Sequence, residues 1–215
     1  MPTSNSSHTV NEELFNKVIK SINRFCTKAI KTGNTKMVLT EAGLQAWIFH
    51  HLQYDLRKES GWGDKTNSKQ IGIHCNPSLL DEANLLRKVP DIIILDKQAY
   101  AVDSSGSLYP RKGYTLWVSS IIILELKLFR TNHRESQDLI KKWKEDIDKF
   151  MDLRIQHYPQ DSRNKFFPTF VLLGKQKISV ETVDQIKQYS IDNKVEPLLF
   201  YPEDDLYKEE HLIKP

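Results

Sequence analysis

Two runs of the same four apolar residues, Ile-Ile-Ile-Leu, constrain the fold of this chain more than any other feature. They cover residues 92–95 and 121–124, and short apolar runs rich in β-branched residues are typical of buried strands. Asp91 precedes the first run, and Glu125 follows the second. If the two strands are antiparallel neighbours, the start of the first lies beside the end of the second. We therefore predict that both carboxylates meet at one edge of a sheet.

The second run continues into the tripeptide Glu125-Leu126-Lys127, which adds a lysine to the two carboxylates. Side chains two residues apart in a strand share a face, so Glu125 and Lys127 point the same way and Leu126 points into the opposite layer. Mg²⁺ takes oxygen ligands and often uses one or two carboxylates with water and phosphate; a backbone carbonyl such as that of Leu126 can complete the set. Such an ion lowers the pKa of its water and stabilises charge on a phosphodiester. Lys127 can orient the attacking water, take part in proton transfer or neutralise the phosphorus centre.

Together with Pro90-Asp91, the tripeptide Glu125-Leu126-Lys127 resembles the PD-(D/E)xK nuclease superfamily, which has the restriction-endonuclease-like fold. The resemblance covers the middle of the chain. It implies a Mg²⁺-dependent DNA endonuclease that hydrolyses phosphodiester bonds, with Mn²⁺ as the other suitable ion. In this interpretation Asp91, Glu125 and the Leu126 carbonyl bind the metal, and Lys127 is catalytic.

In that family an acidic residue on a helix before the sheet often supplies a third ligand. Glu41 is the matching candidate for metal binding and catalysis, and Gln45 is the substitute one turn later. Thr40 is a suitable N-cap, and three apolar residues then recur at helical spacing, namely Leu44, Ile48 and Leu52. Glu41 stands at the head of this inward stripe. Because an acid on a core-facing side needs a partner, a metal ion is the expected one.

The implied fold class is α/β, with a restriction-endonuclease-like core. In this core, helices flank a central mixed sheet in the order helix, three strands, helix, strand (αβββαβ). The hydrophobic periodicity predicts the same order. We expect a helix over 40–57, strands over 70–75, 92–95 and 121–127, a helix over 135–154 and a strand over 169–173, followed by a helix over 180–190 and a strand over 197–201.

The charge pattern between residues 14 and 40 predicts an N-terminal basic amphipathic helix, because this stretch contains no acidic residue. One side is apolar and should pack on the domain. The other side carries five cations at helical spacing, namely Lys17, Lys20, Arg24, Lys28 and Lys31. Like charges at these spacings repel each other, so we expect the row to contact a phosphate backbone. A solvated helix face and a membrane-surface helix are the alternatives.

The long connection between the two motif strands, residues 96–120, holds aromatic and basic side chains. We expect a hairpin there that contacts DNA, with Arg111 and Lys112 as the basic contacts. Aromatic residues in a twisted hairpin also occur for packing alone, and this remains the alternative.

Length and composition fit a single domain over residues 1–215, with residues 1–10 disordered and residues 203–215 forming a solvated tail. The net charge of +3 does not by itself demand nucleic acid. Cys26 and Cys75 cannot build a four-thiolate cluster, so no cofactor beyond the metal is expected. The chain shows neither a signal sequence nor an apolar run of membrane-spanning length, and we expect a cytoplasmic protein that does not bind a membrane.

Three functions are compatible with these patterns. The first is the endonuclease, with DNA as partner and with a homodimer expected where both strands of a duplex are cut. The second is a non-catalytic nucleic-acid-binding or protein-binding member of the same fold that acts within a larger assembly. The third is a receiver domain, because residues 91–96 also resemble a phosphoacceptor strand that ends in Asp96. The sequence leaves open whether the nucleic acid is DNA or RNA, and whether it is single-stranded, branched or duplex.

Overall fold

A five-stranded mixed sheet lies at the centre of the computed structural model, which describes residues 6–33, 35, 38–60, 71–75, 79–80, 87–88, 90–96, 100–102, 108–110, 120–157 and 167–203. The strand order is β1 (Ile71–Cys75), β4 (Ile92–Asp96), β7 (Ser120–Phe129), β8 (Phe167–Gly174) and β9 (Glu196–Phe200). β4 is antiparallel to both β1 and β7, whereas β8 and β9 continue the sheet in parallel with β7. The central strand β7 therefore joins an antiparallel half to a parallel half.

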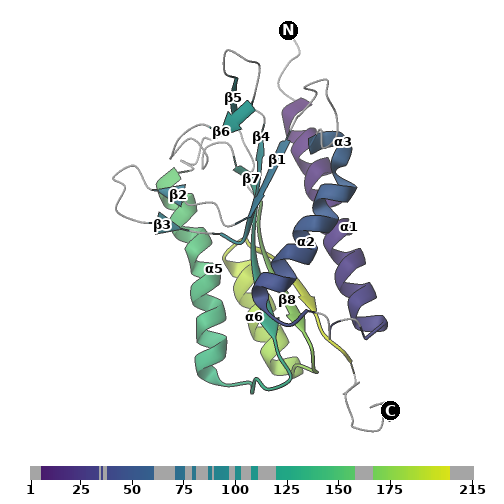
Figure 1. Cartoon of the computed structure of the whole chain (residues 1–215). Coiled ribbons are helices and arrows are strands. Elements are labelled where there is room, and N and C mark those ends of the chain that lie inside the picture. The colour runs from purple at the N-terminus through teal and green to yellow at the C-terminus, as the bar shows by residue number, and fades with distance from the viewer. Residues whose placement is uncertain are drawn as a thin grey trace.

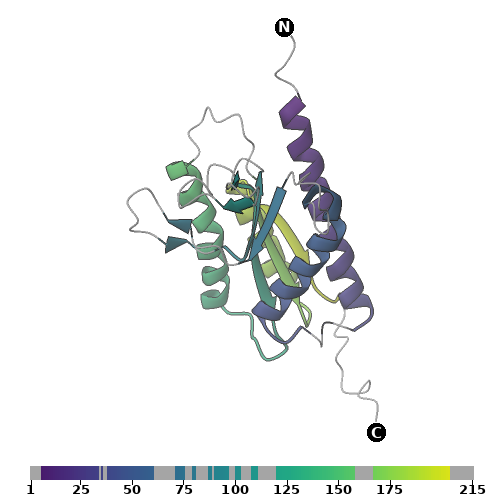
Figure 2. The same ribbon diagram turned by 45° about the horizontal axis from the view of Figure 1, so that its top comes forward.

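Helices cover both faces of the sheet (Figures 1 and 2). On one face lie α1 (Ser6–Lys31) and α2 (Glu41–Asp55), followed by the short α3 (Arg57–Ser60); on the other lie α5 (Gln137–His157) and α6 (Val180–Asp192). None of the helices in the described ranges is long and apolar enough to cross a membrane.

Two small hairpins are inserted between the strands of the antiparallel half. β2 (Leu79–Leu80) pairs with β3 (Arg87–Lys88), and β5 (Tyr100–Val102) pairs with β6 (Leu108–Pro110). The predicted hairpin within residues 96–120 is thus present, and its proposed contact with DNA stays a prediction.

The alternation of side chains along the two Ile-rich strands builds two separate cores. Ile92 and Ile94 of β4 pack on the α1 and α2 side, whereas Ile93 and Leu95 pack on the α5 and α6 side, and all four are buried. Burial of each such side chain contributes about 1.5–3 kcal/mol relative to exposure. Because both faces are covered, neither strand shows a polar side in its sequence.

The face of β7 that looks toward α5 is apolar except at two positions. Ile123 and Phe129 are buried there with the α5 core, but Glu125 and Lys127 lie between them. Charged side chains are costly in such a place unless they are paired. The sheet therefore carries a polar interruption in the middle of an otherwise apolar layer.

The predicted order of helix, three strands, helix and strand is confirmed by α2, β1, β4, β7, α5 and β8, with α6 and β9 as the additional pair. The helix expected over 40–57 ends at Asp55, where Leu56 is the C-cap and its N–H bonds to the Leu52 carbonyl. Residues 57–60 then form α3 as a separate turn. The antiparallel partners on both sides of β4 differ from the parallel sheet of a receiver domain, so the structure argues against Asp96 as a phosphoacceptor.

The N-terminal helix is longer than the sequence suggested. α1 begins at Ser6, ahead of the basic stretch from which the helix was predicted; the expected disorder over residues 1–10 stays a prediction. The apolar side of α1 packs on the domain as predicted, with Val18 and Ile22 buried. Once this packing has formed the helix, each added residue costs little because propagation is far easier than nucleation.

Candidate active site

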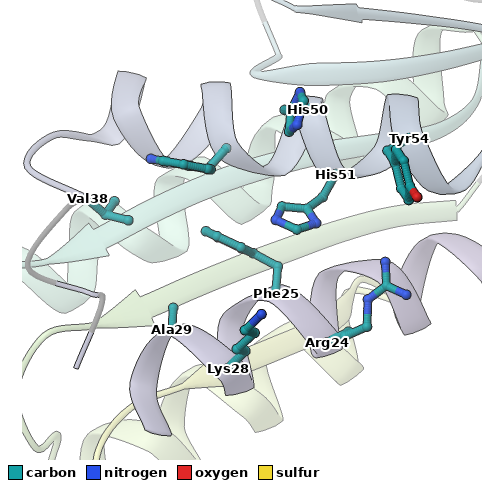
Figure 3. Close-up of a pocket in the computed structure, with 9 residues that line it drawn as sticks. Arg24, Phe25, Lys28, Ala29, Val38, His50, His51 and Tyr54 are labelled. Carbon is teal, nitrogen blue, oxygen red and sulfur yellow. The ribbon is translucent and has the colours of Figure 1, made fainter. Parts of the chain in front are cut away.

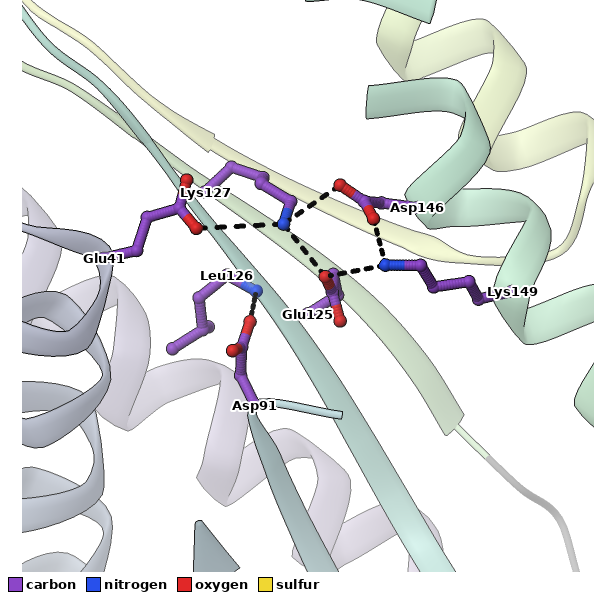
Figure 4. Close-up of polar contacts among 7 residues, drawn as sticks. All are labelled: Glu41, Asp91, Glu125, Leu126, Lys127, Asp146 and Lys149. Carbon is purple, nitrogen blue, oxygen red and sulfur yellow. Dashed lines mark hydrogen bonds and ion pairs between the residues drawn. The ribbon is translucent and has the colours of Figure 1, made fainter. Parts of the chain in front are cut away.

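Asp91 lies directly before β4 and beside the last residues of β7, as the sequence predicted. The register pairs Ile92 with Leu124, which brings Asp91 next to the Glu-Leu-Lys segment. Asp91 Oδ2 accepts a hydrogen bond of 2.7 Å from the backbone N–H of Leu126 (Figure 4). Two segments separated by more than thirty residues in the sequence are thereby joined at one point.

The same contact defines the direction of the Leu126 carbonyl. In a strand, the N–H and C=O groups of one residue point to the same side of the chain. Since the Leu126 N–H points to Asp91, the Leu126 carbonyl lies on the Asp91 side of β7 as well. The Leu126 side chain is buried on the α1 and α2 side. The peptide of Leu126 is thus available to the site, while its side chain belongs to the core.

Glu125 and Lys127 point together toward α5, where they form an ion-pair cluster (Figure 4). Lys127 Nζ lies 2.9 Å from Glu125 Oε1 and 2.9 Å from Asp146 Oδ2 of α5. Lys149 Nζ lies 3.6 Å from Glu125 Oε1 and also pairs with Asp146. The cluster connects the centre of the sheet to α5.

Asp146 and Lys149 are site residues that the sequence interpretation missed. A signal for Asp146 exists, because it follows Trp143 by three positions and precedes Phe150 by four. Both of these residues are buried on the inward stripe of α5, so Asp146 shares their side of the helix. An acid at such a position needs a partner, and Lys127 is that partner.

Glu41 and Gln45 contribute to the site in different ways. Glu41 was expected on the core-facing side of its helix, but its side chain is 49 % exposed and reaches Lys127 at 3.9 Å from the rim. Glu41 is the first residue of α2, and this end of the helix extends beyond the core. Gln45 is only 8 % exposed and donates a hydrogen bond to the backbone carbonyl of Asp91. Gln45 therefore holds the Asp91 backbone.

The start of α2 is fixed by its cap, as predicted. The Thr40 side chain accepts a hydrogen bond of 3.0 Å from the backbone N–H of Gly43. This satisfies one of the free N–H groups at the start of the helix. The cap thus determines where Glu41 enters the helix and, with it, how Glu41 approaches Lys127.

Burial dominates the electrostatics of the two central acids. Glu125 is 6 % exposed, and burial raises its pKa to about 7, with nearby Asp91 adding to the shift and Lys127 opposing it. Burial also raises the pKa of Asp91, against the opposing effects of the Leu126 N–H and Lys127. For Lys127, burial lowers the pKa, but the charges of Glu125 and Asp146 together raise it above the ordinary lysine value. Lys127 is therefore a cation at neutral pH, which favours charge neutralisation over proton abstraction as its role.

The cluster has more acids than bases. Its ionisable groups are four carboxylates and two ammonium groups, so full ionisation leaves an excess of two negative charges, from Glu41, Asp91, Glu125 and Asp146 against Lys127 and Lys149. A divalent cation would balance this excess. Within the described residues, no group of three or more His, Cys, Asp or Glu side chains is placed to hold a metal ion. Asp91, Glu125 and the Leu126 carbonyl nevertheless fit Mg²⁺ or Mn²⁺, because such ions commonly take one or two carboxylates and complete their shell with water.

The five predicted phosphate-contacting cations of α1 are all exposed, but two of them have acidic partners. Lys17 Nζ lies 2.7 Å from Glu59 Oε1, and Arg24 pairs with both carboxylate oxygens of Asp55. These two residues tie α1 to α2 and α3. Among the described residues, Lys20, Lys28 and Lys31 form no ion pair, and their contact with phosphate stays a prediction. Arg111 and Lys112 lie outside the described residues.

The chain matches no family model, no curated protein and no solved structure in comparisons with known proteins. Function must therefore be inferred from the residues of the site and from their geometry.

Proposed function

We propose that this protein is a metal-dependent nuclease with a restriction-endonuclease-like core, which hydrolyses phosphodiester bonds in DNA. The observation that carries the proposal is the hydrogen bond of 2.7 Å from the Leu126 N–H to Asp91, with Lys127 2.9 Å from Glu125 on the same strand. It brings together two carboxylates, a backbone carbonyl and a lysine at one point of the sheet. Phosphodiester hydrolysis needs this combination of oxygen ligands for a cation and positive charge for the phosphate.

Each residue has a defined task in this proposal. Asp91, Glu125 and the Leu126 carbonyl would hold Mg²⁺ or Mn²⁺, with Glu41 at the rim as a further carboxylate. The ion would supply an activated water and would stabilise negative charge on the phosphate. The ammonium group of Lys127 would stabilise the charge that develops on the phosphorus centre.

The two residues of α5 support the site in this proposal. Asp146 contacts Lys127 at 2.9 Å, and Lys149 contacts Glu125 at 3.6 Å. Groups that orient the ligands of a metal site commonly matter nearly as much as the ligands themselves. Asp146 and Lys149 are therefore positioning residues, which hold Lys127 and Glu125 in the absence of substrate.

DNA is the proposed partner because α1 exposes cations that lack an acidic partner among the described residues. Lys20, Lys28 and Lys31 are the candidates on α1, and Arg111 and Lys112 are those of the hairpin connection. A homodimer is proposed for the cutting of both strands of a duplex, since two sites are then available. Sedimentation with and without duplex DNA measures this state directly.

The decisive experiment is a cleavage assay on supercoiled plasmid and on labelled single-stranded DNA with Mg²⁺ or Mn²⁺. The native protein is compared with Asp91→Asn and Lys127→Ala, and with Asp148→Asn as a matched control. Asp148 is an acid of α5 that bonds to Tyr189 instead of the cluster. Metal-dependent cleavage that is lost in the first two variants and kept in the control is the expected result. Cleavage that persists in Asp91→Asn and Lys127→Ala would refute the proposed site.

A non-catalytic binding protein of the same fold is the second candidate. The observation in its favour is that Lys127 already has three carboxylate partners, Glu125, Asp146 and Glu41. DNA binding by native protein without cleavage in either metal would support this candidate. Metal binding, measured by calorimetry, then shows whether the carboxylates keep a ligand role.

A further inference from the structure

A groove between α1 and α2 lies away from the sheet and away from the carboxylate cluster. It has a volume of about 530 Å³ and is lined by nine residues (Figure 3). Six of them bear on the argument, namely Arg24, Phe25 and Lys28 of α1 and Trp47, His51 and Tyr54 of α2. The opposite side of α2 carries Leu44, Ile48 and Leu52, which pack in the core of the sheet. The groove is therefore formed by the outer faces of the two helices.

One wall of the groove consists of flat rings that remain open to water. Trp47 is 39 % exposed and Tyr54 is 54 % exposed, although burial of an aromatic side chain is strongly favourable. The ring planes of Phe25 and Trp47 differ by 15°, with centroids 6.3 Å apart. Figure 3 shows Phe25 and His51 directed into the space between the helices, and their rings lie 4.9 Å apart. The guanidinium carbon of Arg57 lies over one face of the Tyr54 ring, 5.1 Å from its centroid, so the exposed surface of Trp47 and the other face of Tyr54 are the π surfaces left for a planar ligand.

The charged groups of the groove favour an anion. Lys28 is exposed, and no described acid forms an ion pair with it. Arg24 is held at the edge by Asp55, which also accepts a hydrogen bond of 2.6 Å from Ser21. Burial lowers the pKa of His51, so His51 is neutral at pH 7 and acts as a further planar ring. Two cations face one carboxylate, which leaves a positive charge beside the aromatic wall.

We propose that this groove binds an unpaired nucleotide, with its base against Trp47 and Tyr54 and its phosphate against Lys28 and Arg24. Bases stack on aromatic side chains whatever their sequence, and a neighbouring cation holds the phosphate. The volume lies in the range of sites for small organic ligands. A base paired within a duplex has no free face for such a wall. The nucleotide is either a free nucleoside monophosphate or one unit of a single strand.

The groove shares no residue with the carboxylate cluster, so binding there can be measured apart from nuclease activity. Lys28 is also a proposed DNA contact of α1, and the single-strand form of the proposal rests on that proposed function. The proposal is tested by calorimetry on the full chain in EDTA, so that binding is measured without cleavage. The ligands are a nucleoside 5′-monophosphate, the matching nucleoside, inorganic phosphate and a short single-stranded oligodeoxynucleotide. We expect the monophosphate to bind more tightly than either the nucleoside or phosphate. Only the monophosphate has both a base for the aromatic rings and a phosphate for Lys28 and Arg24.

Three variants and one control locate the binding. Trp47→Ala should weaken the monophosphate roughly tenfold, a typical loss for one stacked base, and Trp47→Phe should retain most of the affinity. Lys28→Ala should weaken it severalfold. Lys187→Ala is the matched control, since Lys187 is an exposed lysine of α6 that does not line the groove, and it should bind as the native protein does. Thermal melting confirms that each variant is folded.

The outcomes separate the two sources of the nucleotide and also define failure. If the oligonucleotide binds more tightly than the monophosphate and loses affinity in the same variants, the groove holds part of a single strand. If only the monophosphate depends on these residues, the groove holds a free nucleotide. Absence of monophosphate binding by native protein, equal binding by Trp47→Ala, or an equal effect of Lys187→Ala and Lys28→Ala would overturn the proposal.

Discussion

Lys127 Nζ lies 2.9 Å from Asp146 Oδ2, which links the central strand of the sheet to α5. Both side chains are largely buried, with 14 % and 16 % exposed. A pair in such surroundings is sensitive to the loss of either partner, because the remaining charge is left without compensation. The proposed active site is therefore not confined to the two motif strands, and α5 forms its second half.

The Asp146→Asn variant tests this role of α5. We expect the rate of DNA cleavage to fall by about 10–100-fold, as is typical when a supporting group of a metal site is removed. Lys127 and Lys149 would lose one of the two carboxylates that they share and would keep Glu125, whereas DNA affinity should stay unchanged. Steady-state kinetics separates the two effects. Asp148→Asn on the same helix should cleave at the native rate, and equal rates in both variants would contradict a positioning role for Asp146.

Metal binding should stabilise the folded protein. We expect Mg²⁺ or Mn²⁺ to raise the unfolding free energy by about 2.7 kcal/mol when the free ion is at a hundredfold excess over its dissociation constant. The physical reason is the excess of two negative charges in the cluster, which a divalent cation removes. Thermal melting at constant ionic strength measures the effect, with a monovalent salt as control. Asp91→Asn should abolish the metal-dependent increase, and an undiminished increase would place the ion elsewhere.

Glu125 should make the stability of the metal-free protein depend on pH. Its pKa is raised from the ordinary value of 4.5 to about 7 by burial. Between these values the folded protein holds a proton that the unfolded chain has released, so the contribution of Glu125 to stability is greatest below pH 4.5 and is lost as pH rises through 7. Glu125→Gln removes this titration, because the amide resembles the protonated acid.

We therefore expect Glu125→Gln to exceed the native protein in stability above pH 7 and to approach it at low pH. Urea unfolding in EDTA over a series of pH values measures the difference. Glu135 serves as the control acid, because its pKa is lowered by hydrogen bonds from the Ser179 backbone and side chain despite partial burial. Glu135→Gln should instead be less stable than native protein at neutral pH. A constant offset between Glu125→Gln and native protein at all pH values would show that Glu125 does not carry the effect.

The buried amide of Gln45 should contribute to stability through the Asp91 backbone. Gln45→Ala removes the donor to the Asp91 carbonyl, and we expect a loss of about 1–3 kcal/mol, the usual cost of an unsatisfied buried group. Chemical denaturation measures the loss. Gln188, which bonds to Asp192 on the exposed side of α6, is the matched control, and Gln188→Ala should change stability by less than about 0.5 kcal/mol. Equal effects of the two variants would argue against a special role for Gln45.

The sequence was sufficient for the fold order and for the meeting of the motif strands because these depend on local patterns. The runs at 92–95 and 121–124 specify strands by their composition, and the acids at their opposite ends meet as soon as the strands are antiparallel. Prediction of the Thr40 cap succeeded for the same reason, since capping needs only neighbouring residues. Each strand and the cap are specified within a few residues of the chain, and the meeting of the acids follows from the antiparallel pairing of the two strands.

Contacts between distant elements could not be predicted in the same way. The pairs of Lys17 with Glu59 and Arg24 with Asp55 depend on the angle at which α1 crosses α2 and α3, which the row of cations in the sequence does not reveal. The exposed position of Glu41 likewise depends on how far α2 extends beyond the core. Tertiary packing decides each of these contacts, and hydrophobic periodicity alone does not specify it.

The shared ion pairs of β7 and α5 also affect how the chain can evolve. Loss of Lys127 leaves buried carboxylates without their cation, and loss of Asp146 removes a partner of both Lys127 and Lys149, so positions 127, 146 and 149 are expected to co-vary in homologous chains. Exposed positions of α5, such as Lys141 and Glu145, can be substituted one at a time without leaving a buried charge. The helix thus carries two different evolutionary constraints on its two sides.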